Sequence, residues 1–397
     1  MRIALVTHSF DAFEYGGVPT IVKNIAKSAG QESNIELDIF SFEGSRHSPY
    51  SFSFSRPKSI LATRFFKDID FLEFSLYRVG SFNSDFEIFR YRQRKNLKNR
   101  LETYDCVLIV TGFLQFANVV PRLNVPIFVQ CATRLIWERH SQYLRMSFLK
   151  RNVLKLQIPF LQYLEKKVLQ EKKIFLVENS KMWNWISSES EASVIRWYPG
   201  VNDNFVATTF QDTPKSNGCF ISIGRLAEAR KGWGRMLEAY SIAYDATKDL
   251  PKLVIVGSGD FSESDQSLLE KYAQYPIEIY RGISDYERDS LLLSASIFLQ
   301  SSYEEGLGLA AIEAMSFGLP LICSETDGSR EYVRSGMNGL LIEQDSKFIT
   351  NFAQGIIESQ TWDYDRFSRN SKDIFENNFS LESSFDSLLA ILYSEAE

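Results

Sequence analysis

Short apolar segments alternate with helical segments through the second half of the chain, and this alternation is the feature that most restricts its fold. The apolar segments read as buried strands, at Phe220–Ile223, Leu253–Val256, Ile277–Tyr280, Ile297–Gln300, Leu319–Cys323 and Leu340–Ile342. Strands that alternate with helices form βα units, whose strands pair in parallel because each helix carries the chain back to the same edge of the sheet. The second half therefore predicts an α/β domain with a parallel sheet.

The first half predicts a second, less regular domain. We expect a strand at Arg2–Thr7, then a glycine-containing loop and a helix from Pro19, which suits a first helical turn. The other expected elements are strands at Ile35–Phe42, Cys106–Val110, Pro126–Gln130 and Val194–Trp197, and a helix at Arg139–Lys173 broken by Pro159. A chain of 397 residues fits two domains of about 150–200 residues. We place them at 1–198, joined by a C-terminal helix at 380–397, and at 199–379.

The net charge of −6 hides a difference between the halves. Residues 1–200 carry a net charge of +9 and residues 201–397 one of −15, so we expect the two halves to have different partners. No apolar run has the length of a transmembrane helix, and the apolar stretch at the start is too short for a signal peptide. Four scattered cysteines and three histidines show no metal-ligand spacing, which predicts a cytoplasmic protein with reduced thiols and no metal.

The strongest candidate site follows an expected strand, in the segment Ser301–Gly318. Gly306 and Gly308 allow the backbone to approach a ligand closely, and the helix that opens there presents unpaired N–H groups to an anion. Glu313 lies among apolar residues of that helix and is expected to be buried, where its carboxylate requires hydrogen-bond donors. Two adjacent ribose hydroxyls would supply them; an internal lysine or the backbone is the alternative.

Two further segments follow expected strands in the same half. In ISIGRLAEARKG, Arg225 and Lys231 are suited to a pyrophosphate, although both are also ordinary surface residues. Gly257-Ser258-Gly259 resembles a dinucleotide fingerprint but lacks its third glycine, which weakens a dehydrogenase interpretation. Asp68-Ile69-Asp70 and Asp363-Tyr364-Asp365 could be taken for metal-binding pairs, and we interpret both as solvated carboxylates.

Together these segments resemble the retaining glycosyltransferases of family 4, which have the GT-B fold of two Rossmann-like parallel-sheet domains facing a cleft. The matching elements occur in the family's order, and they are Gly16-Gly17, Pro199-Gly200-Val201, Gly224-Arg225, Lys231-Gly232, Gly257-Ser258-Gly259, Gly282-Ile283-Ser284, Glu305-Gly306-Leu307-Gly308, Glu313-Ala314-Met315, Gly328 with Glu331, and Asn338-Gly339. The resemblance is strong over 194–343, faint over 1–30 and 105–135, and absent over 45–100.

The resemblance implies a role for each matching residue. Arg225 and Lys231 would hold the donor diphosphate and stabilise the charge of the departing nucleotide, and Glu305 would orient the donor sugar. Glu313 would bind the ribose hydroxyls. The remaining donor-binding residues would be Gly16, Gly17, Gly224, Gly257, Ser258, Gly282, Ile283, Gly306, Leu307, Gly308 and Leu309. No metal and no cofactor beyond the nucleotide-sugar donor is implied.

Two positions depart from the family pattern. The family often has a histidine after the strand that matches Pro126–Gln130, where this chain has Cys131-Ala132-Thr133. The junction motif usually ends in aspartate after Gly-Val, where this chain has Asn202 followed by Asp203. The first departure bears on the identity of the donor more than on the class of reaction.

The sequence therefore predicts a metal-independent, retaining hexosyltransferase that uses a nucleoside-diphosphate sugar. A nucleotide-sugar epimerase of the same fold and a non-catalytic nucleotide-sugar-binding protein are the alternatives. Basic, aromatic-rich stretches at Phe89–Leu101 and Arg139–Lys173 suggest contact with the inner face of an anionic membrane, and a solvated basic face explains them equally well. The expected acceptor is a glycan or lipid-linked molecule of bacterial surface polysaccharide synthesis. No nucleic-acid motif is present, and the sequence does not indicate an oligomeric state.

Overall fold

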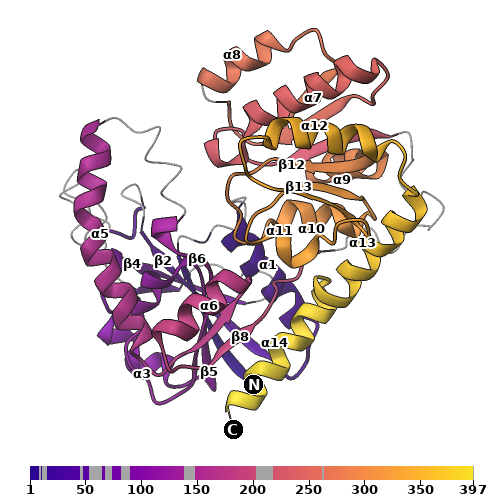
Figure 1. Ribbon diagram of the computed structural model, residues 1–397. Coiled ribbons are helices and arrows are strands. Elements are labelled where there is room, and N and C mark those ends of the chain that lie inside the picture. Colours follow the sequence, from indigo (N-terminus) through magenta and orange to yellow (C-terminus); the bar gives the residue numbers. More distant parts are fainter. Residues whose placement is uncertain are drawn as a thin grey trace. The chain divides into compact units, whose positions relative to one another are not determined.

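The computed structural model describes residues 1–8, 10, 16–44, 48–52, 65–67, 74–81, 90–137, 148–202, 218–261 and 263–396 (Figure 1). The chain divides into two compact units. Unit 1 comprises Met1–Gly200 and Leu381–Glu397, and unit 2 comprises Val201–Ser380. Each unit is built on its own sheet.

Unit 1 contains an eight-stranded sheet in the order β3-β4-β2-β1-β5-β6-β7-β8, parallel except for β3 at its edge. Its strands are β1 (Arg2–His8), β2 (Glu36–Glu43), β3 (Phe65–Lys67), β4 (Ser75–Gly80), β5 (Cys106–Phe113), β6 (Ile127–Thr133), β7 (Ile174–Val177) and β8 (Val194–Arg196). Its helices are α1 (Gly17–Ala29), η2 (Lys95–Leu97), α3 (Lys98–Leu101), η3 (Leu114–Val119), α5 (Phe148–Leu169), α6 (Ser180–Glu189) and α14 (Leu381–Ala396).

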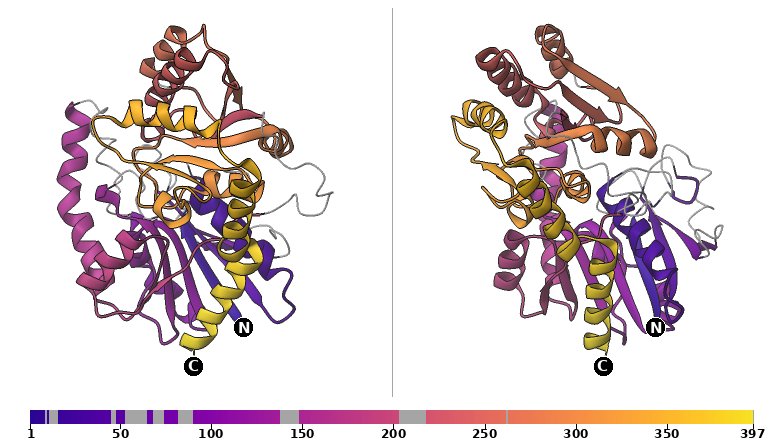
Figure 2. Two further views of the ribbon diagram at one scale, coloured as in Figure 1. Left: turned by 45° about the vertical axis from the view of Figure 1, so that its right-hand side comes forward. Right: turned by 90° about the vertical axis from the view of Figure 1, so that its right-hand side faces the viewer.

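Both faces of this sheet are covered, because successive side chains of a strand point to opposite faces. Ala4 and Val6 of β1 pack into the apolar cluster formed with η3, α5 and α6. The helix α1 contacts β5 and β2, and the C-terminal helix α14 packs against α1, so α14 belongs with unit 1 in both views of Figure 2.

The helix expected at Arg139–Lys173 differs from the prediction. Its first part lies outside the described residues, and α5 continues through Pro159 without a break. Pro159 lies on the exposed side of α5, where water can satisfy the carbonyl that loses its partner. Among the described residues no helix is both long and apolar enough to cross a bilayer.

Unit 2 contains a fully parallel sheet in the order β11-β10-β9-β12-β13-β14, which confirms the predicted α/β class. Its strands are β9 (Cys219–Ile223), β10 (Leu253–Gly257), β11 (Ile277–Arg281), β12 (Ala295–Gln300), β13 (Leu321–Ser324) and β14 (Gly339–Ile342). Its helices are η4 (Ala229–Lys231), α7 (Trp233–Thr247), α8 (Glu263–Lys271), α9 (Asp285–Ser294), α10 (Leu309–Ser316), α11 (Ser329–Tyr332), α12 (Phe348–Ser359) and α13 (Tyr364–Asn378). All six predicted strands are present.

The core of unit 2 lies between the sheet and α7, α8 and α12. Trp233 and Tyr240 of α7 and Phe352 of α12 are among its largest fully buried side chains. On the other face, α9 contacts β9, α10 contacts β12, and α13 packs against α10 (Figure 1). Helices on both faces leave the carboxyl ends of the strands as the open edge of the sheet, from which the candidate loops extend.

Candidate functional site

Two loops of unit 2 meet at the carboxyl ends of β9 and β12. These strands are neighbours in the sheet, but the chain continues from β9 toward β10 on one side and from β12 toward β13 on the other. Open parallel sheets bind ligands at such a switch point, because the loops there diverge and leave room between them. The two loops cover residues 224–232 and 301–308.

Gly232 brings the two loops into contact. Its φ of +67° is left-handed, and a Cβ atom there would lie 2.4 Å from the carbonyl oxygen of Ser301, so glycine is required. Arg235 of α7 donates from Nε to the same carbonyl at 2.5 Å, and the Tyr303 N–H donates to the carbonyl of Arg230 at 2.7 Å. The loops are thus joined through their backbones before any charged pair is considered.

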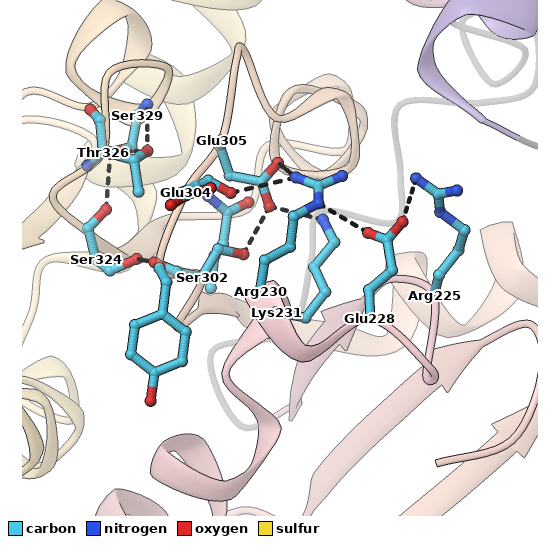
Figure 3. A network of polar contacts seen from close by, with 12 residues as sticks. Arg225, Glu228, Arg230, Lys231, Ser302, Glu304, Glu305, Ser324, Thr326 and Ser329 are labelled. Carbon is cyan, nitrogen blue, oxygen red and sulfur yellow. Dashed lines mark hydrogen bonds and ion pairs between the residues drawn. The ribbon is translucent and has the colours of Figure 1, made fainter. Parts of the chain in front are cut away.

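Glu305 lies at the centre of the polar contacts in Figure 3. Its side chain is only 5% exposed. Lys231 Nζ and Ser302 Oγ each donate to Oε1 at 2.6 Å, and Arg230 Nη1 donates to Oε2 at 3.1 Å. Lys231 and Glu305, which were predicted separately as site residues, are therefore in direct contact.

The pKa of Glu305 reflects two opposing effects. Burial raises it, because a desolvated carboxylate is unfavourable, but the charges of Lys231 and Arg230 outweigh burial and lower the pKa to about 2. Glu305 is therefore ionised at every physiological pH. It can accept hydrogen bonds in a fixed orientation, but it cannot donate a proton.

Among the described residues, Arg225 pairs with Glu228 and not with Glu305. Its guanidinium is half exposed and pairs with Glu228 Oε1 at 2.5 Å, while Glu228 Oε2 pairs with Arg230 Nε at 2.9 Å. Five charges thus alternate in sign from Arg225 through Glu228, Arg230 and Glu305 to Lys231 (Figure 3), and we call this series the charge chain. Arg225 forms its exposed end.

The predicted glycines at the ends of β9, β10 and β11 lie close together. A Cβ atom on Gly257 would lie 2.1 Å from the carbonyl oxygen of Gly224, and one on Gly224 would crowd the Lys231 side chain at 3.1 Å. Ser258 accepts from the Leu226 N–H at 3.0 Å, and Gly282 donates to the Gly257 carbonyl at 3.0 Å. Ile283, next along the chain, is partly exposed.

The turn from Gly306 to Leu309 joins β12 to α10. Gly308 adopts a left-handed φ of +99°, and a Cβ atom there would lie 2.7 Å from Tyr332 Oη. Leu307 is buried beneath Gly328, whose own Cβ would lie 2.3 Å from the Leu307 carbonyl oxygen. Gly306 and Leu309 are partly exposed beside it. These contacts explain why the turn has glycine at 308 and why glycine packs against it at 328.

Glu313 is partly exposed as a whole residue, while its carboxyl group is desolvated. Among the described residues it has no hydrogen-bond or ion-pair partner, and desolvation raises its pKa although Arg288 of α9 opposes the shift. It does not contact the charge chain.

Gly16 and Gly17 belong to unit 1, in which they begin α1 after β1. Gly16 has an extended backbone and accepts from the Thr20 N–H at 3.0 Å. A Cβ atom on Gly17 would meet no atom within 4 Å, so the space beside it is open.

Unit 1 has a second buried carboxylate at the carboxyl ends of its strands. Glu178 follows β7, is 2% exposed, and accepts a hydrogen bond from Gln130 Nε2 of β6. Burial raises its pKa to about 7, and the Gln130 amide only partly opposes this. The stretch Cys131-Ala132-Thr133, where the family often has a histidine, begins next to Gln130, and Cys131 is also buried.

Three members of the Glu305 environment were not predicted from the sequence, namely Glu228, Arg230 and Ser302. Arg230 and Glu228 lie in the quoted segment ISIGRLAEARKG, where neighbouring opposite charges would have been the available signal. Ser302 is the second residue after β12, at the edge of the sheet where loop side chains reach a ligand. Which of these side chains turns toward Glu305 depends on the fold.

No metal centre is found among the described residues. They contain no group of three His, Cys, Asp or Glu side chains able to hold an ion. Asp363 accepts from the Arg366 N–H at 3.2 Å and caps α13, which explains this carboxylate structurally. Asp68-Ile69-Asp70, Asp203 and most of the segment 45–100 lie outside the described residues.

Comparison with known proteins identifies similar chains. Residues 208–374 match the model of glycosyl transferases group 1. An uncharacterised glycosyltransferase of Methanocaldococcus jannaschii is 31% identical over 173 residues, which cover 42% of this chain and 42% of that protein. The matched segments span between 25% and 52% of the first four curated relatives.

The structural comparisons cover nearly the whole chain. The crystal structure of WaaG, a glycosyltransferase involved in lipopolysaccharide biosynthesis, is 16% identical with a TM-score of 0.68 over 98% of this chain and 99% of WaaG. Anabaena HepE in complex with UDP-glucose is 15% identical with a TM-score of 0.66, over 98% and 99%. At these identities the likeness concerns the fold. The chain therefore has the GT-B fold, and its residues 208–374 are similar to the glycosyl transferases group 1.

Proposed function

We propose that this protein transfers a hexose from a nucleoside-diphosphate sugar to a glycan or lipid-linked acceptor, with retention at the anomeric carbon and without a metal ion. The contact of Lys231 with Glu305 at the switch point of unit 2 carries the proposal. It places a cation suited to a diphosphate beside an ionised carboxylate suited to sugar hydroxyls.

The proposed reaction breaks the bond between the anomeric carbon and the diphosphate oxygen. The acceptor hydroxyl forms the new bond to that carbon, and its proton leaves with the nucleoside diphosphate. Lys231 and Arg225 would stabilise the charge that develops on the departing phosphate. Glu305 would hold the sugar through its hydroxyls, and Glu313, which has no partner in the described structure, would accept from the ribose. The acceptor would bind unit 1.

A donor screen tests this proposal directly. Thermal-shift measurements with UDP-, GDP-, ADP- and dTDP-sugars should identify one stabilising donor. Glu313→Ala should then raise the donor Kd about tenfold or more through loss of charged hydrogen bonds. Glu376→Ala, an exposed carboxylate on α13, is the matched control and should leave the Kd unchanged.

Product analysis separates the alternatives. Turnover of the donor without any acceptor would indicate an epimerase. Donor binding with no transfer to any acceptor in a cell extract would indicate a binding protein. Unchanged donor affinity in Glu313→Ala would contradict the assigned nucleotide site.

We further propose that α5 attaches the protein to an anionic membrane, at the inner face of the cell membrane where lipid-linked acceptors of surface polysaccharide synthesis would be met. Leu156, Phe160 and Tyr163 are 82%, 41% and 61% exposed, and their spacing places them on one face of the helix. Exposed apolar side chains grouped in this way favour an interaction surface.

The charge of α5 supports an anionic bilayer as the partner. The helix has five basic residues and one acidic residue, and Lys155 and Lys166 are exposed beside the apolar face. Each such cation contributes about 1 kcal/mol near an anionic bilayer. The protein should pellet with vesicles that contain about one third phosphatidylglycerol when the salt concentration is low. High salt should release it from the vesicles.

The matched variants separate the apolar and charged contributions. Leu156→Ser with Phe160→Ser should abolish pelleting, and Lys155→Gln with Lys166→Gln should weaken it and reduce its salt dependence. Pelleting that is equal for the wild type and the serine variant would exclude this face of α5 as the membrane contact.

A further inference from the structure

The charge chain contains one cation, Arg230, to which the proposed reaction gives no role. Its side chain is 18% exposed, and its Nη1 donates both to Glu305 Oε2 at 3.1 Å and to the Glu304 carbonyl at 3.2 Å. Its own carbonyl accepts from the Tyr303 N–H at 2.7 Å. The backbone and the side chain of Arg230 therefore form hydrogen bonds with three successive residues of the loop that carries Glu305.

Lys231 and Arg230 differ in how easily each can leave its contacts with the Glu305 loop. Lys231 Nζ contacts the loop only through Glu305 in the described structure, and its flexible stem can redirect the ammonium group. Arg230 has a planar guanidinium whose Nε pairs with Glu228 while its Nη1 pairs with Glu305 and Glu304. A diphosphate that attracts Lys231 would therefore leave Arg230 in place.

Without Arg230, movement of Lys231 to a diphosphate would leave the negative charge of Glu305 without a paired cation. The carboxylate is 5% exposed, and a buried carboxylate without a cation favours its protonated form. Ser302 donates one hydrogen bond but carries no charge. Two other ionisable groups interact electrostatically with Glu305, namely Cys323 of β13 and Tyr332 of α11. Burial raises the pKa of each, so both stay neutral.

We propose that Arg230 is the positioning residue of Glu305, holding its carboxylate ionised and oriented while Lys231 binds the donor diphosphate. The part of this proposal in which Lys231 binds the donor diphosphate rests on the proposed function. The hold of Arg230 on Glu305 rests on the contacts of the charge chain alone. Glu228 completes the arrangement by pairing with Arg230 Nε on the side away from Glu305.

The titration of Glu305 tests the hold of Arg230 without any activity measurement. Lys231→Met mimics the withdrawal of Lys231, and the Cδ resonance of Glu305 is identified by its loss in Glu305→Gln. In Lys231→Met, Glu305 should still titrate below about pH 5, because Arg230 remains. In Lys231→Met with Arg230→Met, the midpoint should rise by about two pH units or more, since an adjacent opposite charge lowers a carboxyl pKa by about 1–3 units. Equal midpoints in the two variants would overturn the proposal.

Steady-state kinetics of single Arg230 variants, in which Lys231 is retained, test how the positioning of Glu305 affects sugar transfer. Arg230→Met should lower kcat about 100-fold and change KM for the donor less than about threefold, because it disturbs the oriented carboxylate and not the diphosphate ligands. Arg230→Lys should recover about tenfold of the loss by restoring the charge. Arg369→Met, an exposed arginine on α13, is the control and should match the wild type.

The two failures are distinguishable. An inactive wild-type protein that binds no donor would remove the proposed function, while the Glu305 titration would still support or overturn the hold of Arg230. An active wild type in which Arg230→Met raises KM and leaves kcat unchanged would show that Arg230 binds the donor itself, which contradicts a positioning role. If Arg230→Met fails to fold, Arg230→Lys decides: a lowered kcat with an unchanged KM supports a positioning role, and a raised KM with an unchanged kcat contradicts it.

Discussion

Two buried glutamates, one in each unit, lie at the carboxyl ends of parallel strands and have opposite electrostatic properties. Glu305 of unit 2 is held by Lys231 and Arg230, which lower its pKa to about 2. Glu178 of unit 1 is held by the amide of Gln130, and burial raises its pKa to about 7. The position in the fold is similar, so the neighbouring side chains decide the charge.

The physical lesson is that burial and pairing act separately. Desolvation raises the pKa of both carboxyls, and only a cation placed within hydrogen-bond distance reverses the shift. A permanently ionised carboxylate suits the orientation of a polar ligand. A carboxyl that titrates near neutrality makes unit 1 sensitive to pH.

The largest expected effect is that Glu305→Gln destabilises the protein by about 3–5 kcal/mol at pH 7. The substitution leaves two poorly exposed cations, Lys231 and Arg230, without their common partner. Because the folded-state pKa is depressed, the wild type loses this stability as the pH falls from about 4.5 toward 2, and the difference should shrink there.

Urea unfolding at pH 7 and at pH 4 measures this effect. Glu278→Gln, which removes an exposed ion pair with Lys252, is the matched control and should cost less than about 1 kcal/mol. An equal cost for both variants would mean that burial does not distinguish Glu305.

The same substitution at Glu178 should have the opposite effect on the free energy of unfolding. Glu178→Gln should stabilise the protein by about 3 kcal/mol at pH 8, because it keeps an acceptor for Gln130 and removes a buried charge. The folded-state pKa is raised, so the wild type loses stability as the pH rises from about 4.5 to about 7, and the gain should vanish below that window.

Unfolding free energies of the wild type and Glu178→Gln at pH 5 and pH 8 provide the test. The exposed Glu191→Gln serves as control and should show no pH-dependent difference from the wild type. A gain that is equal at both pH values would exclude titration of Glu178 as its cause.

The smallest effect on stability is expected for Arg225→Met. The guanidinium is half exposed and pairs with Glu228 three residues away, so its loss should change the free energy of unfolding by less than about 0.5 kcal/mol. Donor affinity should nevertheless fall about tenfold if Arg225 holds the diphosphate. Thermal unfolding with and without the donor measures both quantities. A large loss of stability would mean that Arg225 supports the fold of the charge chain.

Much of unit 2 could be predicted from the sequence. Its strands are short apolar runs between helices, and βα periodicity depends on local composition that needs no knowledge of the fold. The contact between Lys231 and Glu305 was also accessible, because both follow strands whose carboxyl ends share one edge of the sheet. The predicted break at Pro159 was wrong, since it depends on which face of the helix meets solvent.

The sequence by itself determined the parallel-sheet class, the order of the glycine turns and the loops that carry charge. These features follow from periodicity and from the backbone freedom of glycine. The tertiary structure decided which cations reach Glu305, which carboxylates lose water and where α5 exposes Leu156 and Tyr163. Burial and pairing are properties of residues far apart in the chain, so the pKa of Glu305 and of Glu178 arises only when the strands have assembled.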